Sequence, residues 1–149
     1  MTKKDKDLLL KDLVGRLPYG VKVQMPIWDY NDKMTIEEDA TLYSVNTYGY
    51  CETVEYDVKI SVEEITPYLF PLSSMTEEQY KEWCELEEEP LDEILTRNAN
   101  GEKMSTLEHH LLIAKSLTDS INYCYKNHFD IYGLIPKGLA KDATGLNIY

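Results

Sequence analysis

The sequence predicts an α+β fold in a single domain spanning residues 1–149. Three segments between residues 21 and 62 have the apolar alternation of half-buried strands, and two helix-start signals follow at Thr76 and Ser105. Strands in one block followed by helices are typical of α+β proteins rather than of parallel α/β folds. We expect a small, curved antiparallel sheet of three to five strands, either open or partly closed into a barrel, packed by a long C-terminal helix and shorter helices.

The first elements are a helix and a strand. Apolar residues recur at helical spacing from Leu9 to Leu17, and Pro18-Tyr19-Gly20 ends that pattern. Val21, Val23 and Met25 then alternate with polar residues, which predicts a strand that Pro26 ends. The polar, acidic stretch 28–39 is expected to be a long loop or an irregular hairpin tip.

Two further strands are predicted at 42–47 and 54–62, joined by a turn at Tyr48-Gly49-Tyr50. The second has the clearest alternation in the chain, since residues 54, 56, 58, 60 and 62 are all apolar or aromatic. Cys51 and Thr53 fall on the opposite parity, so we expect a β-bulge near them.

The remaining segments predict helices. Thr76 with Gln79 and Ser105 with Glu108 have the spacing of capping boxes. The first helix should fray at Glu87–Pro90 and lead to a linker at 98–101, and the second should span about 106–127. Asp130 is expected to cap a short last helix, made short or kinked by Pro136 and Gly138. The predicted core stripe of the long helix consists of Leu107, Leu111, Ala114, Leu117, Ile121 and Tyr125.

Negative charge is concentrated in the middle of the chain. Residues 27–100 contain 19 Asp and Glu against 4 Lys and Arg, a net charge of −15 within a total of −12. This segment should repel polyanions and attract a basic partner, so direct binding of nucleic acid is not expected.

The expected location is the cytoplasm. The N-terminal apolar run, Leu8–Leu10, is too short and too charged in its surroundings for a signal peptide, and Leu111–Ala114 is far shorter than the roughly 20 residues of a membrane span. Three widely spaced cysteines indicate reduced thiols rather than a disulfide framework.

No motif indicates a cofactor, a metal or a catalytic group. Cys124 and His128 share a helix face, but His110 lies too far along the same axis to join them on one ion. The stretch from Asp29 lacks the Gly and Glu of a calcium loop, and Lys137 stands on the wrong side of Gly138 for a phosphate loop. An enzyme is therefore disfavoured but left open.

Acidic and aromatic residues gather in or next to the predicted loops. Tyr and Trp are frequent interface anchors, and carboxylates around them would steer a basic partner. The alternative is that the aromatics complete the core and the acids only solubilise the chain. The candidate partner-binding residues are Trp28, Asp29, Tyr30, Asp32, Tyr48, Tyr50 and Glu52.

Three blocks, at 17–21, at 67–78 and at 128–140, include Leu-Pro-Tyr-Gly-Val, Pro-Leu-Ser-Ser-Met-Thr-Glu-Glu and His-Phe-Asp-Ile-Tyr-Gly-Leu-Ile-Pro-Lys-Gly-Leu-Ala. Together they resemble a group of small uncharacterised proteins of gut anaerobic bacteria, their phages and mobile elements. Members often have Arg where this chain has Tyr132. The resemblance implies a mobile-element accessory protein and brings no activity or catalytic residue.

These observations favour a non-enzymatic, cytosolic protein that docks a basic protein partner through an acidic, aromatic loop face. The first alternative is an inhibitor whose acidic face imitates nucleic acid and blocks a DNA- or RNA-acting enzyme. The second is a small hydrolase or transferase that uses carboxylate acid-base chemistry. The oligomeric state is left open.

Overall fold

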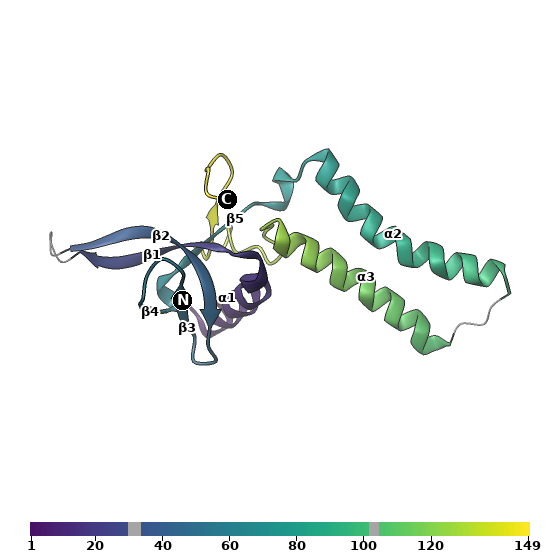
Figure 1. Ribbon diagram of the computed structural model, residues 1–149, viewed down its shortest axis with the longest axis horizontal. Coiled ribbons are helices and arrows are strands. Elements are labelled where there is room, and N and C mark those ends of the chain that lie inside the picture. Colours follow the sequence, from purple (N-terminus) through teal and green to yellow (C-terminus); the bar gives the residue numbers. More distant parts are fainter. Residues whose placement is uncertain (30–33, 102–104) are drawn as a thin grey trace. The chain divides into compact units, whose positions relative to one another are not determined.

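The computed structural model describes residues 1–29, 34–101 and 105–149 (Figure 1). Helices and a six-stranded, mainly antiparallel sheet make the chain an α+β protein, which confirms the predicted fold class. The chain forms two compact units. The first unit contains Met1–Ser74 and His128–Tyr149, and the second contains Met75–Asn127.

Helix α1 (Lys3–Arg16) opens the first unit and confirms the first predicted helix. Thr2 caps it, because its hydroxyl accepts the Asp5 N–H while the Asp5 carboxylate accepts the Thr2 N–H. A 3-10 turn over Leu17–Tyr19 follows, and Gly20 ends it at φ 67°, a left-handed conformation that favours glycine. Leu9 and Leu13 of α1 are fully buried in the same core as the sheet residues.

The sheet has the strand order β4-β3-β2-β1-β5-β6 and is open at β4 and β6 in the described part of the chain. The first five strands in this order pair antiparallel, and the two-residue β6 pairs parallel with β5. Their bounds are β1 Lys22–Asp29, β2 Met34–Val45, β3 Tyr50–Thr53, β4 Lys59–Ser61, β5 Thr66–Leu69 and β6 Lys141–Asp142.

The prediction that Pro26 ends the first strand is wrong, and the direction of its backbone explains why. Alternate residues of an antiparallel strand direct their N–H and C=O groups to the same neighbour. The Leu42 N–H donates to the Val21 carbonyl at 2.9 Å, so in the β1–β2 register the odd-numbered residues of β1 face β2. The missing N–H of Pro26 falls on the other edge, where it breaks no bond of that ladder.

The long loop expected at 28–39 is wrong, and the irregular hairpin tip expected as its alternative is too long, because both strands of the β1–β2 hairpin extend into this stretch. Trp28 and Asp29 belong to β1, and β2 begins at Met34, with Ile36 paired with Ile27. Residues 30–33 lie outside the described residues. Charge density suggested a loop, but an acidic strand is stable when its carboxylates find donors, and Asp39 accepts a hydrogen bond of 2.7 Å from the Tyr68 hydroxyl.

The single strand predicted over 54–62 is wrong. Strand β3 ends at Thr53, β4 begins at Lys59, and a 3-10 turn covers Val62–Glu64. Val54, expected in the core, is 67% exposed. The Val54 N–H still donates to the Thr41 carbonyl, but the Thr41 N–H (2.6 Å) and hydroxyl (2.7 Å) donate to the Glu55 carboxylate, so a side chain takes the place of the next backbone acceptor. The irregularity expected near Cys51 lies on the neighbouring strand, as a register shift between Leu42 and Ser44.

The second unit is a helical hairpin in which α2 (Glu77–Ala99) and α3 (Thr106–Lys126) run side by side in opposite directions (Figure 1). Both predicted capping boxes form, at Thr76–Gln79 and at Ser105–Glu108. The prediction that the first helix frays at Glu87–Pro90 is wrong, because α2 continues through Pro90.

The predicted core stripe of the long helix is also mostly wrong. Leu107, Leu111, Leu117 and Ile121 are all exposed, whereas Ser116, Ser120 and Cys124 are buried. The face of α3 that contacts α2 is the polar one: the Ser116 hydroxyl donates to the Leu86 carbonyl, and the Tyr123 hydroxyl donates to the Gln79 carbonyl. Hydrophobic periodicity alone therefore predicted the wrong face of α3 as the buried one.

The short C-terminal helix does not form. Asp130 therefore caps no helix; its two carboxylate oxygens instead accept the N–H groups of Leu134 (2.8 Å) and Ile135 (2.9 Å). The chain then continues as turns, because Gly133 and Gly138 adopt positive φ and Pro136 lacks an N–H.

Candidate functional site

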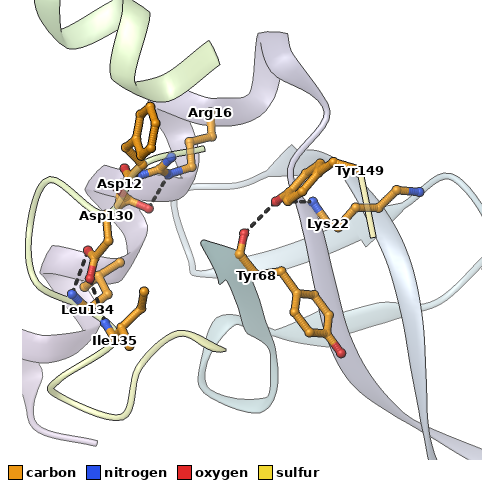
Figure 2. Close-up of polar contacts among 9 residues, drawn as sticks. Asp12, Arg16, Lys22, Tyr68, Asp130, Leu134, Ile135 and Tyr149 are labelled. Atoms are coloured by element: carbon orange, nitrogen blue, oxygen red, sulfur yellow. Dashed lines mark hydrogen bonds and ion pairs between the residues drawn. The ribbon is translucent and has the colours of Figure 1, made fainter. Parts of the chain in front are cut away.

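A buried polar cluster joins α1 to the C-terminal segment within the first unit (Figure 2). Asp12 and Arg16 are both fully buried and form a two-bond ion pair, with distances of 2.7 Å and 2.8 Å. Arg16 also donates to the Phe129 carbonyl at 2.7 Å. Burial raises the pKa of Asp12, and the hydrogen bonds from Arg16 oppose that rise.

The last residue of the chain lies against the same segment. The Tyr149 hydroxyl donates to the Tyr68 carbonyl at 2.6 Å and accepts the Lys22 N–H at 3.3 Å (Figure 2). The Tyr149 ring stacks on His128 with 3.8 Å between centroids. Burial raises the pKa of Tyr149 to about 12, while burial and the nearby Arg16 charge lower the pKa of His128 to about 4.

We interpret this cluster as structural. Each oxygen of Asp12 and Asp130 accepts a hydrogen bond from Arg16 or from the backbone, so both carboxylates hold the segment in place. Sequence reasoning missed it, although one signal was present: Asp12 and Arg16 are four residues apart beside Leu9 and Leu13, so two charges share the buried side of an amphipathic helix.

The structure spreads the predicted partner-binding residues over several elements of the sheet. Trp28 and Asp29 end β1, while Tyr50 and Glu52 lie in β3. Tyr48 is in the turn before β3, where the Asn46 side chain accepts the N–H groups of Tyr48 and Tyr50. Tyr48 is 83% exposed, and Trp28 and Tyr50 are each 49% exposed. Tyr30 and Asp32 lie outside the described residues.

Two grooves flank β4 and bring some of these residues together. One groove, of about 430 Å³, is lined by Tyr43, Glu52, Asp57, Val58 and Lys59, among others. The other, of about 330 Å³, is lined by Pro26, Ile27, Trp28, Val58, Lys59, Ile60 and Glu64. Trp28 and Glu52 therefore line adjacent grooves, whereas Tyr48 and Tyr50 are not among the described lining residues of either.

Taken together, the described lining residues of the two grooves are net negative, whereas those of the groove beside Trp28 alone balance one cation with one acid. Lys59 is the one cation among their described lining residues, and it pairs with Glu52 at 3.7 Å. Glu52 also accepts a hydrogen bond from the Tyr43 hydroxyl, which raises the pKa of Tyr43. Asp57 and Glu64 add two further carboxylates. Sequence reasoning missed Tyr43, Asp57, Val58 and Glu64, because it treated 42–47 and 54–62 as regular strands, with Val58 on the packed face and Asp57 on the wet one.

Other kinds of site have less support in the part of the chain that the structure describes. No group of three His, Cys, Asp or Glu side chains there could hold a metal ion. Burial raises the pKa of Cys51 to about 11, so this thiol is protonated at neutral pH and is a core residue rather than a nucleophile. No helix within the described ranges combines the length and the apolar character needed to cross a membrane.

Comparison with known proteins gave no match to a family model, to a curated protein or to a solved structure.

Proposed function

We propose that this chain is a non-enzymatic protein-binding module that docks a basic protein partner on the sheet of its first unit. The binding surface, called here the β4 surface, consists of Trp28, Tyr43, Glu52, Asp57, Val58, Lys59 and Glu64. The observation that carries the proposal is the pair of adjoining grooves beside β4, which combine exposed aromatic side chains with a net negative lining. Aromatic anchors with surrounding carboxylates favour a partner of opposite charge.

The proposal includes a setting. We infer a cytoplasmic accessory protein of a phage or mobile element, and this part is supported by the three sequence blocks and by the spacing of the cysteines. The partner would then be a protein of the host or of the same element with an exposed basic patch.

Affinity capture from cells of the source organism tests the proposal. The tagged chain should recover a basic protein at low salt, and the triple variant Glu52→Gln, Asp57→Asn, Glu64→Gln should not recover it. Gln at position 64 can still accept the Ser61 N–H, so the variant keeps the cap of the turn at Val62–Glu64.

A charge-matched control uses three exposed acids of α2: Glu78→Gln, Glu85→Gln, Asp92→Asn. It changes the net charge by the same amount, and it should capture the partner as the unmodified chain does. Equal capture by both triple variants would show that the β4 surface is not the docking site.

A further inference from the structure

The groove beside Trp28 lies between strand edges of β1 and β4, and these edges, at Pro26–Trp28 and at Lys59 and Ile60, are called here the seam. Strand β5 pairs with only Val23 and Gln24 of β1, so no described strand pairs with the outer edge of β1 from Met25 to Trp28. Strand β4 is at one end of the strand order and pairs with β3 alone. The two uncovered strand segments face one groove, because Pro26, Ile27 and Trp28 of β1 line it together with Lys59 and Ile60 of β4.

Backbone groups on both sides point into this seam. Since the odd-numbered residues of β1 face β2, the N–H and C=O groups of Trp28 face the opposite edge. On the other side, the Val62 N–H donates to the Gly49 carbonyl. In the β3–β4 register, the backbone N–H and C=O groups of Ile60 therefore face β3, and those of Lys59 and Ser61 face outward. The Ser61 N–H donates to Glu64, so Lys59 presents the outward N–H and C=O groups of β4.

Side chains at the seam suit one kind of segment. Ile27 and Ile60 give the groove apolar lining, and Trp28, which is half exposed, stands beside them. Glu64 lines the same groove, and Glu52 and Asp57 line the next one. A segment that alternates apolar and basic residues would place one set of side chains in the groove and the other set against the carboxylates.

We propose that the seam between β1 and β4 binds an extended, apolar and basic segment of the partner as an added β-strand. Uncovered strand edges are templates for such pairing, in which main-chain hydrogen bonds give affinity and pockets for alternate side chains give specificity. Because β4 and the outer half of β1 run in opposite directions, the added strand is antiparallel to one edge and parallel to the other. This inference rests on the proposed function and specifies the form of its partner.

The test compares two synthetic peptides on the unmodified chain. The probe is a nine-residue peptide of alternating valine and lysine with blocked termini. The matched peptide has the same sequence, but the backbone nitrogen of each lysine is methylated. Both have the same charge and side chains, but the second lacks the N–H groups that face one strand edge. We expect at least a tenfold weaker affinity for the methylated peptide, by fluorescence anisotropy. With the probe bound, hydrogen exchange of the Trp28 and Lys59 amides, followed by NMR, should slow.

Two variants locate the site. Trp28→Ala and Glu64→Gln should each weaken probe binding severalfold with an unchanged NMR spectrum in the second unit, while Glu85→Gln should not. Equal affinity for both peptides, lost at 0.5 M NaCl, would overturn strand addition and leave the acidic docking surface standing. Failure of both peptides to bind would also overturn strand addition. The proposed function fails separately, when the triple variant of the β4 surface still captures the partner.

Discussion

His128 is the residue whose protonation should couple most directly to stability. It is 8% exposed, it stacks on Tyr149, and its Nδ1 atom is buried without a hydrogen-bond partner among the described residues. Its pKa is lowered from 6.5 to about 4, so the folded chain holds the neutral ring. Between these two pH values the unfolded chain binds more protons than the folded chain.

The free energy of unfolding should therefore decrease as pH falls from about 6.5 to about 4, by up to about 3 kcal/mol from this group. Urea unfolding at pH 7 and at pH 4.5 measures the loss. His128→Asn is the control, because Asn tolerates the positive φ of 57° and does not titrate. If the variant loses as much stability as the unmodified chain, His128 does not carry the effect.

Removal of Arg16 should destabilise the fold mainly because the buried carboxylate of Asp12 then loses its ion-pair partner. Arg16→Met removes both hydrogen bonds to buried Asp12 and the one to Phe129, so we expect a loss of about 3–5 kcal/mol in the free energy of unfolding. The double variant Asp12→Asn, Arg16→Met buries no charge and should be less destabilised than the single one. Denaturant titrations of both variants check this, and an equally unstable double variant would contradict it.

These residues show which parts of a site can be predicted from sequence. The capping boxes predicted at Thr76 and Ser105 form between residues three apart, so local spacing was enough to indicate them, and the boxes at Thr2 and Ser61 have the same spacing. The contact between Arg16 and Phe129 joins residues 113 apart, and no local pattern signals it. Trp28 and Glu52 were identified from composition, but the grooves that they line depend on the sheet topology.

Within the helical hairpin, α3 compensates for a defect in α2. Pro90 has no N–H for the Leu86 carbonyl, and the Ser116 hydroxyl of α3 donates to that carbonyl at 3.3 Å. Ser116→Ala should lower the free energy of unfolding by about 1 kcal/mol, because it leaves the carbonyl unpaired in a partly buried place. In a Pro90→Ala background the same substitution should cost clearly less.

A double-mutant cycle on these two positions measures the coupling. Thr118→Ala is a suitable control, since its hydroxyl bonds to its own helix at Ala114 and has no part in the contact between the helices. Additive effects of Ser116→Ala and Pro90→Ala would show that the two residues act independently.

Among the secondary-structure elements, helices were easier to predict from the sequence than strands. Helices α1 and α3 have local start signals and 3.6-residue periodicity, and both lie where the sequence places them. Strands depend on their neighbours: Pro26 is tolerated because of the edge that it faces, and Val54 leaves the alternating pattern because Glu55 bonds to β2. The buried face of α3 was mistaken because polar contacts with α2 outweighed its apolar periodicity.

For the whole molecule, the distribution of charge is the basis of the predicted class of partner. Residues 27–100 carry −15, and they include the last three residues of β1 and all of β2, β3, β4 and β5. The predicted partner-binding residues and the β4 surface together contain five acids: Asp29, Asp32, Glu52, Asp57 and Glu64. All five fall in this segment. We therefore predict that a cationic protein is attracted to the same part of the chain that should repel a phosphate backbone.

We accordingly predict that the purified chain does not bind duplex DNA or single-stranded RNA tightly at 50 mM NaCl. Polyanion binding requires a cluster of cations that releases counterions, whereas Lys59 is the only cation that the described lining of the two grooves offers. Fluorescence anisotropy with labelled oligonucleotides measures this, and a dissociation constant weaker than roughly 10⁻⁴ M is expected. Tight binding that weakens with salt would contradict both the predicted class of partner and the docking surface. In that case the charged residues to examine would be the lysines of α1, which lie outside the acidic segment.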